Sequence, residues 1–250
     1  MGALEITCII LGVLCAVTIA VNIILFVTRG RAQEAVETPA ESEIAPAQAA
    51  PVEDEALDSE QAVAALGRGE VRESESGAIV VTAEGDFIYL RYNKSFTAKL
   101  IQAKDEVREY YNELKNFVTS YKKVHTRISW KHESVNNGRN KICRFVMRGK
   151  SLYVYLPLNP DDYAESKYKV ERAEAKRYAE LPCLYKITNG RRVEYATQLI
   201  DVVMEQFDTE RTGKTGKDYV SKYPYEDTLS LIKRKLIKVT RSTSPILTEK

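Results

Sequence analysis

One segment near the start of the chain constrains its architecture more than any other: residues 6–27 read ITCIILGVLCAVTIAVNIILFV, with no charged side chain. At about 1.5 Å per residue, a helix of this length spans about 33 Å, enough to cross a hydrocarbon core of about 30 Å. A cleaved signal peptide fits less well, because the preceding residues MGALE carry no basic charge and the run exceeds the usual length of about 7–15 residues. The run from Ile6 to Val27 is therefore predicted to be a transmembrane helix that contacts the lipid bilayer.

The basic residues that flank this run set its expected orientation. No Lys or Arg precedes the run, whereas Arg29 and Arg31 follow it. Positive charge favours the cytoplasmic side, so the sequence predicts a single-pass protein of the cell membrane whose C-terminal part is cytoplasmic. Beyond the run only Cys143 and Cys183 remain, too few for a disulfide framework, which agrees with a reducing compartment.

Charge then divides the rest of the chain. Residues 32–77 hold twelve acidic and two basic side chains, a net charge of −10. The whole chain carries +2 and residues 1–31 carry +1, so residues 78–250 carry +2 + 10 − 1 = +11. Residues 32–77 also contain no aromatic side chain and are interrupted by Pro39, Pro46 and Pro51. Such a segment buries too little apolar surface to offset its ordering entropy, so we predict a disordered acidic linker.

Residues 78–208 have the mixed periodicities of an α+β domain: a small antiparallel sheet with helices packed on one face. Residues 209–250 are expected to be a polar linker followed by a short helix (225–235) and a short strand (236–239). The patterns predict two amphipathic helices over 105–121 and 192–207. They also predict strands at 78–82, 87–92, 126–130, 141–147, 151–158 and 181–188, and a helical turn at 95–101.

Four stretches of this region carry a resemblance: SFTAKLIQAKDEVREYYNELKN (95–116), TRISWKHESVNNGRNKICRF (126–145), VMRGKSLYVYLPLNPDDY (146–163) and VERAEAKRYAELPCLYKI (170–187). They resemble a domain of unknown function that recurs in clostridial proteins, hence in bacteria, sometimes in several copies and sometimes beside a membrane anchor. The segment YPYEDTLSLIKRKLIKV (223–239) is similar to tails of that group. The resemblance covers most of 95–239, implies an α+β domain, and implies no catalytic residue.

The residues that could belong to catalytic or cofactor-binding motifs do not have the spacing that those motifs require. Gly213-Lys214-Thr215 lacks the upstream Gly of a phosphate-binding loop, since position 208 is Asp208. His125, His132 and the two cysteines have no short metal-ligand spacing. We therefore assign no catalytic residue, no metal site and no cofactor. An enzyme of unrecognised type is the least favoured of the functional hypotheses.

The sequence indicates a candidate binding surface on one face of the predicted sheet. Alternation along the predicted strands puts Cys143, Phe145 and Met147, with Ile128 and Trp130, on an apolar face. The opposite face would combine arginine and tyrosine, interleaved with Ile142 and Val146, a combination suited to anion binding and stacking. An ordinary solvated sheet face is the alternative, since cross-strand Arg–Tyr pairs also cover a pleat. The candidate binding residues are Arg127, Lys131, Arg139, Arg144, Arg148, Lys150, Tyr153 and Tyr155.

Two functions from different classes fit this surface. The first is a membrane-tethered cytoplasmic interaction module that binds an acidic protein or ligand without catalysis. The second is nucleic-acid binding by the basic Arg/Tyr face, which the acidic residues interspersed through 78–250 and the lack of an RNA-binding signature disfavour. Nucleic-acid binding should weaken steeply with salt, which would distinguish the two.

Overall fold

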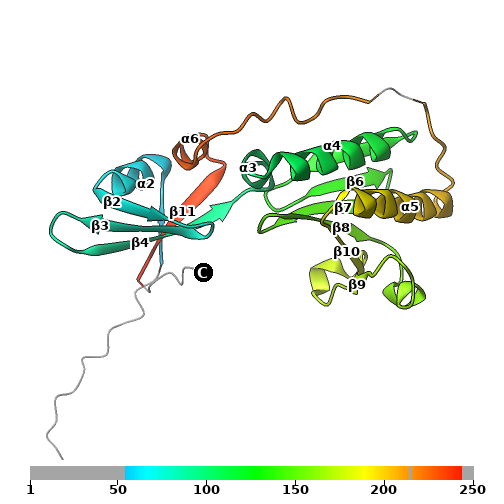
Figure 1. Ribbon diagram of the computed structural model, residues 1–250, viewed down its shortest axis with the longest axis horizontal. Helices are drawn as coiled ribbons and strands as arrows, with labels where there is room; N and C mark the ends of the chain where they lie inside the picture. The colour runs from blue at the N-terminus through cyan, green and yellow to red at the C-terminus, as the bar shows by residue number, and fades with distance from the viewer. Residues whose placement is uncertain (1–53, 214–215, 244–250) are drawn as a thin grey trace, which may run out of the picture. The chain divides into compact units, whose positions relative to one another are not determined.

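The computed structural model describes residues 54–213 and 216–243, and shows two antiparallel sheets with a few helices, an α+β arrangement (Figure 1). The five-stranded sheet has the order β1-β11-β4-β3-β2, and the six-stranded sheet has the order β5-β6-β7-β8-β10-β9. The sequence predicted the α+β class and the antiparallel pairing, but it predicted one sheet where the structure has two. Within the described residues no helix is both long and apolar enough to cross a membrane; the predicted span at 6–27 lies outside them.

The five-stranded sheet joins strands from both ends of the described chain. Its helices, α2 and α6, form with it a core of their own that includes Leu90, Leu231 and Val239. The elements are β1 (Glu55–Leu57), α2 (Ser59–Leu66), β2 (Gly69–Glu73), β3 (Gly77–Thr82), β4 (Phe87–Lys94), α6 (Thr228–Lys233) and β11 (Ile237–Ser242).

This sheet corrects the predicted linker, because residues 55–77 form β1, α2 and β2 rather than a disordered segment. Asp58 caps α2 in a capping box with Gln61, which stabilises the helix start. β1 pairs with β11, which lies far away in the sequence, and β2 forms a hairpin with β3, which follows it directly. All five residues of β2 are exposed, so its composition stays polar and resembles that of a disordered segment. The predicted boundary at residue 78 is therefore wrong, and residues 32–53 lie outside the described part.

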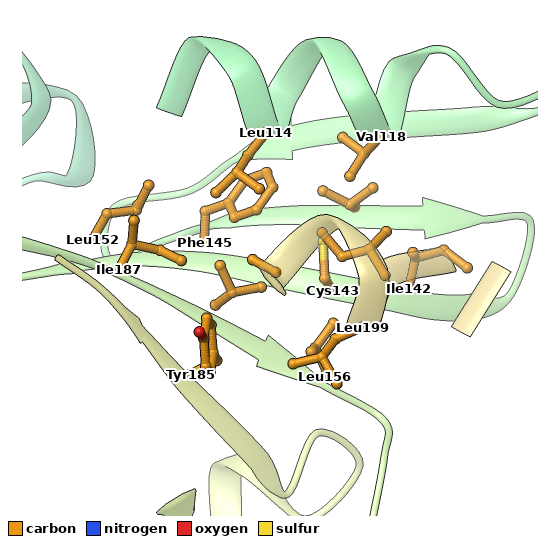
Figure 2. Close-up of a cluster of buried hydrophobic side chains, with 14 of the residues drawn as sticks. Leu114, Val118, Ile142, Cys143, Phe145, Leu152, Leu156, Tyr185, Ile187 and Leu199 are labelled. Atoms are coloured by element: carbon orange, nitrogen blue, oxygen red, sulfur yellow. The ribbon is translucent and has the colours of Figure 1, made fainter. Parts of the chain in front are cut away.

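The six-stranded sheet is covered on one face by α4 and α5 (Figure 1). Figure 2 shows Leu114 and Val118 of α4 and Leu199 of α5 over sheet side chains such as Phe145 and Leu156. The helices lie close to the predicted ranges because their apolar stripes repeat at helical spacing. The elements are α3 (Phe96–Ile101), α4 (Asp105–Thr119), β5 (Val124–Ile128), β6 (Glu133–Asn137), β7 (Asn140–Arg148), β8 (Ser151–Leu156), η1 (Pro160–Tyr163), β9 (Glu171–Arg172), η2 (Lys176–Tyr178), β10 (Cys183–Ile187) and α5 (Gly190–Gln206).

A bulge in the β6–β7 pair changes which side chains face the core. The register shifts between Val135 and Asn136, and both Ile142 and Cys143 are buried in the core under α4 and α5. Strict alternation had placed Ile142 on the opposite face, beside the arginines. That prediction is wrong because a bulge inserts one extra residue and interrupts the period of two.

The start of β6 also differs from expectation. The predicted strands at 126–130 and 141–147 leave residues 133–139 without a strand, but Glu133 to Asn137 form one between β5 and β7. β5 ends at Ile128, which is 37% exposed. Trp130 lies beyond the strand and donates its indole N–H to Asn93 at 3.0 Å. Ile128 is the register partner of Glu133, which pairs with Phe145, so it lies on the helix-covered face as predicted but is partly exposed at the edge of the sheet. Trp130, being beyond the strand, does not belong to that face.

The face of the six-stranded sheet opposite α4 and α5 is partly covered by the segment that carries β9 and η2 (Figure 1). Tyr178 and Leu181 of this segment form a small second core with Val146, Tyr155 and Leu184 of the sheet. We call this side of the sheet the outer face.

Candidate functional site

The outer face carries a row of side chains that runs across five strands. Cross-strand register places Arg127 opposite Ser134, Ser134 opposite Arg144, Arg144 opposite Tyr155, and Tyr155 opposite Leu184. Residues paired in register point to the same side of a sheet. The next row along the strands aligns Val146, Tyr153 and Lys186. The sheet thereby collects basic and aromatic side chains from separate strands, as the alternation predicted for Arg127, Arg144, Tyr153 and Tyr155.

The covering segment completes this site by stacking a second tyrosine on the sheet. The rings of Tyr155 and Tyr178 are stacked, with centroids 4.0 Å apart and an interplanar angle of 13°. The guanidinium carbons of Arg177 and Arg144 lie 5.0 Å and 5.6 Å from the centroid of the Tyr178 ring. Tyr155 is fully buried and Tyr178 is only 6% exposed, so their rings are packed on each other.

Arg148 and Lys186 extend the cluster toward Tyr153. The guanidinium carbon of Arg148 lies 5.4 Å from the ring centroids of both Tyr153 and Tyr155, and Arg148 donates a hydrogen bond to the Tyr155 hydroxyl. The ammonium of Lys186 lies 5.8 Å from the Tyr153 ring. These distances are within the range of cation–π attraction. We call the following set the Arg/Tyr cluster: Arg144, Arg148, Tyr153, Tyr155, Arg177, Tyr178 and Lys186.

Among the described residues, the cations of this cluster have no carboxylate partner. None of the ion pairs found within residues 54–213 and 216–243 involves Arg144, Arg148, Arg177 or Lys186. Glu180, which follows η2 closely, pairs with Lys141 instead. The Nε atom of Arg144 is buried and has no hydrogen-bond partner in the described structure. A buried donor without a partner costs free energy.

The electrostatic effect of these cations is visible at neighbouring groups. The pKa of His132 is lowered by burial and by the charges of Arg144 and Arg177. Burial alone would raise the pKa of Tyr178, yet its pKa is lowered, because hydrogen bonds with Tyr155 and Arg148 and the charges of Arg177 and Arg148 outweigh burial. The arginine contributions to both shifts have the sign expected from nearby positive charge, whereas burial raises the pKa of Tyr155 in the same cluster.

Three of the eight predicted binding residues lie elsewhere. Lys131 is in the loop between β5 and β6, and Arg139 follows Gly138 in the turn between β6 and β7; both are exposed. Lys150 lies in the turn between β7 and β8, where it lines a cavity with Glu73, Glu75 and other residues. The structure therefore keeps Arg127 in the cross-sheet row and Arg144, Arg148, Tyr153 and Tyr155 in the cluster, and separates these three turn and loop residues from them.

Arg177, Tyr178 and Lys186 were missed by the sequence reasoning, as was the nearby His132. Lys186 was predictable, because it lies in a predicted strand and alternates with the buried Tyr185 and Ile187. The Arg-Tyr pair of η2 carries no comparable signal, since only the tertiary fold brings the 171–182 segment over β7 and β8.

A second polar cluster lies on the other face of the same sheet, under α4. Lys115 donates to Glu133 at 2.7 Å and to the Tyr111 hydroxyl at 2.9 Å, and Tyr111 donates to the other Glu133 oxygen at 2.7 Å. Glu133 and Tyr111 are fully buried and Lys115 is 6% exposed. The Tyr219 ring covers the Lys115 ammonium at 4.8 Å. We call Tyr111, Lys115 and Glu133 the buried triad; it is closed to solvent and its charges are matched.

The described residues offer little for nucleophilic or metal chemistry. Burial raises the pKa of the Cys183 thiol to about 12, and burial, with the charge of Glu133, raises the pKa of Cys143 well above its usual value. A thiol is nucleophilic only when it ionises. In the part of the chain that the structure describes, no group of three or more His, Cys, Asp or Glu side chains could hold a metal ion.

Comparisons of the chain with protein-family models, with curated proteins and with solved structures found no match.

Proposed function

We propose that this protein is a non-catalytic interaction module that binds an acidic protein or ligand at the Arg/Tyr cluster. The observation that carries the proposal is the set of four cations gathered around three tyrosines with no carboxylate partner among the described residues. Guanidinium groups bind carboxylates and phosphates through paired N–H donors. Because Arg144 is half-buried, its charge is less screened by water than a surface charge would be.

The same geometry favours an acidic protein or ligand over nucleic acid. Single-stranded nucleic acids bind by stacking their bases on exposed aromatic rings. Tyr155 and Tyr178 stack on each other and are almost fully buried, so only Tyr153 has a partly exposed ring in the cluster. Nucleic-acid binding is therefore the second candidate function, and only the density of arginines supports it.

The proposal includes the setting in which the module acts. The uncharged run at 6–27 and the arginines at 29 and 31 support a single-pass anchor with the folded part on the cytoplasmic side. The anchor would hold the Arg/Tyr cluster near the membrane surface, where its partner would be recruited. Protease added outside intact cells should leave the folded part uncut, and its digestion would contradict this orientation.

Binding is tested with the full chain in a neutral detergent, titrated against fluorescent polyglutamate and against a single-stranded oligonucleotide over a range of salt. Arg144→Gln with Arg177→Gln should weaken polyglutamate binding at least tenfold, about 1.4 kcal/mol. A control of equal charge, Lys131→Gln with Arg139→Gln, should change it less than about twofold, because exposed charges outside the cluster contribute little.

Equal losses in both double variants would show that net charge, not the cluster, attracts the ligand. Tighter binding of the oligonucleotide with a steep salt dependence would support the second candidate instead. Absence of binding to either probe would contradict the proposed function.

A further inference from the structure

The five-stranded sheet ends in an edge strand whose outer side nothing in the described structure covers. β2 pairs with β3 on one side and is the last strand in the sheet order. Its five residues, Gly69-Glu70-Val71-Arg72-Glu73, are all exposed. An edge strand presents unpaired backbone N–H and C=O groups to any other strand that approaches it.

The hydrogen bonds of the β2–β3 hairpin show which backbone groups are free. The Ser74 N–H donates to the Gly77 carbonyl at 2.7 Å, so these two residues form a hydrogen-bonded pair. In an antiparallel ladder hydrogen-bonded and non-hydrogen-bonded pairs alternate. Arg72 and Glu70 therefore bond to β3, and the residues between them do not.

The pairing of β3 with β4 leads to the same result. The Thr82 N–H donates to the Asp86 carbonyl at 2.9 Å, and alternation then assigns the backbone groups of Val80 to β4. Val80 is the register partner of Val71. The backbone groups of Val71, and by alternation those of Gly69 and Glu73, consequently point away from the sheet.

These three residues form a self-complementary edge. If two copies of β2 meet antiparallel about a two-fold axis at Val71, then Val71 faces Val71 of the second copy and Gly69 faces its Glu73. The backbone can form two hydrogen bonds in the central pair and two in each flanking pair. In the same register Glu70 faces Arg72 of the second copy twice, so both side-chain pairs join opposite charges.

The side of β2 that faces α2 adds apolar contact. Val71 is 41% exposed and Leu229 is 42% exposed, and both line a cavity of about 370 Å³ together with Leu66. Val71 of a second copy would lie beside Val71 at the open side of this cavity, and cover apolar surface that one copy leaves in water.

β5, an edge strand of the other sheet, lacks this complementarity. It also has five residues, VHTRI. Pairing with itself about its central Thr126 would place His125 opposite Arg127, which joins no opposite charges. The charge pattern therefore distinguishes β2 from an edge strand of equal length.

We propose that two copies of this chain associate through β2, forming a continuous ten-stranded sheet about a two-fold axis at Val71. Such an isologous contact closes on itself and produces a dimer rather than a filament. The surface lies in the five-stranded sheet and is independent of the Arg/Tyr cluster.

The test measures the mass of the full chain in a neutral detergent by sedimentation equilibrium. Val71→Pro should abolish the dimer, because it removes an outward N–H that β3 does not use. Arg72→Glu should weaken the dimer at least tenfold by placing it opposite Glu70, and adding Glu70→Arg should restore it. The charge variants are exposed side-chain changes, so they keep the test valid if the proline variant fails to fold.

Cysteine cross-linking tests the register separately. Val71→Cys should form a disulfide-linked dimer under mild oxidation, since facing residues in a hydrogen-bonded pair have Cα atoms about 5.5 Å apart. Arg72→Cys should not, because position 72 faces position 70. A monomeric wild-type chain at every concentration, a dimer that Val71→Pro and Arg72→Glu leave unchanged, or equal cross-linking at both positions would overturn the proposal.

Discussion

The six-stranded sheet carries a cation–tyrosine cluster on each face, and the two clusters differ in one respect. Under α4, Lys115 lies against Tyr111 and is neutralised by Glu133. On the outer face Arg144, Arg148 and Arg177 lie against tyrosines and have no carboxylate partner among the described residues. A fully buried charge must be paired because desolvation is costly, whereas a charge at the surface is solvated or bound by a partner. The charges of the buried triad are therefore matched within the fold, whereas the outer cations have no carboxylate partner among the described residues.

The largest effect is expected from breaking the buried triad. Lys115→Met leaves Glu133 buried without a counter-charge and should lower the free energy of unfolding by about 3–5 kcal/mol. Urea denaturation measures this loss. Adding Glu133→Leu should recover much of it, because apolar groups of similar size can replace a buried ion pair. A loss below about 1 kcal/mol for Lys115→Met would show that Glu133 is solvated.

A second prediction concerns the bulge that moves Ile142 to the helix-covered face. Ile142→Ala should cost about 2–5 kcal/mol, as expected for a truncated core side chain. Ile128→Ala is the matched control on the edge strand β5 of the same sheet and should cost much less, since Ile128 is 37% exposed. If both variants lower the free energy of unfolding by an equally small amount in thermal or urea denaturation, Ile142 does not lie in the core under the helices.

The outer cations should behave in the opposite way from Lys115. Arg177→Gln removes an exposed charge that stands beside other positive charges and has no ion-pair partner in the described structure. We expect the free energy of unfolding to change by less than about 0.5 kcal/mol, while anion binding weakens. A destabilisation as large as that of Lys115→Met would make this arginine a structural residue rather than a binding residue.

The smallest predicted effect is a pH dependence at His132. Its pKa is lowered in the folded protein by burial and by Arg144 and Arg177, so below a pH of about 6.5 the unfolded chain binds more protons there. Stability should therefore fall as the pH decreases through 6.5 toward the folded pKa, and less so in His132→Gln. Arg144→Gln should raise the His132 pKa measured by NMR. No change in that pKa would mean that Arg144 does not act on the imidazole.

Much of the outer face was predictable because it follows local alternation. Tyr153 and Tyr155 alternate with buried residues along β8, and Arg144 and Arg148 do so along β7. The apolar stripe of α5 also correctly predicted which side of this helix packs against the core.

The rest depends on contacts between distant residues. Ile142 was misplaced because a bulge breaks the period of two, and Tyr178 was missed because its stacking partner lies in another element. Residues 55–77 were predicted to be disordered because β1 finds its partner only in β11, near the other end of the described chain.

The central claim, that the Arg/Tyr cluster is the anion-binding site, is tested most directly by mapping backbone amide shifts of the full chain as polyglutamate is added. The account predicts saturable shifts concentrated in β7, β8, η2 and β10, around Arg144, Tyr153 and Tyr178, with little change around Lys115 or in β2. Shifts concentrated at Lys131, Arg139 and Lys150, or spread evenly over the basic residues, would contradict it.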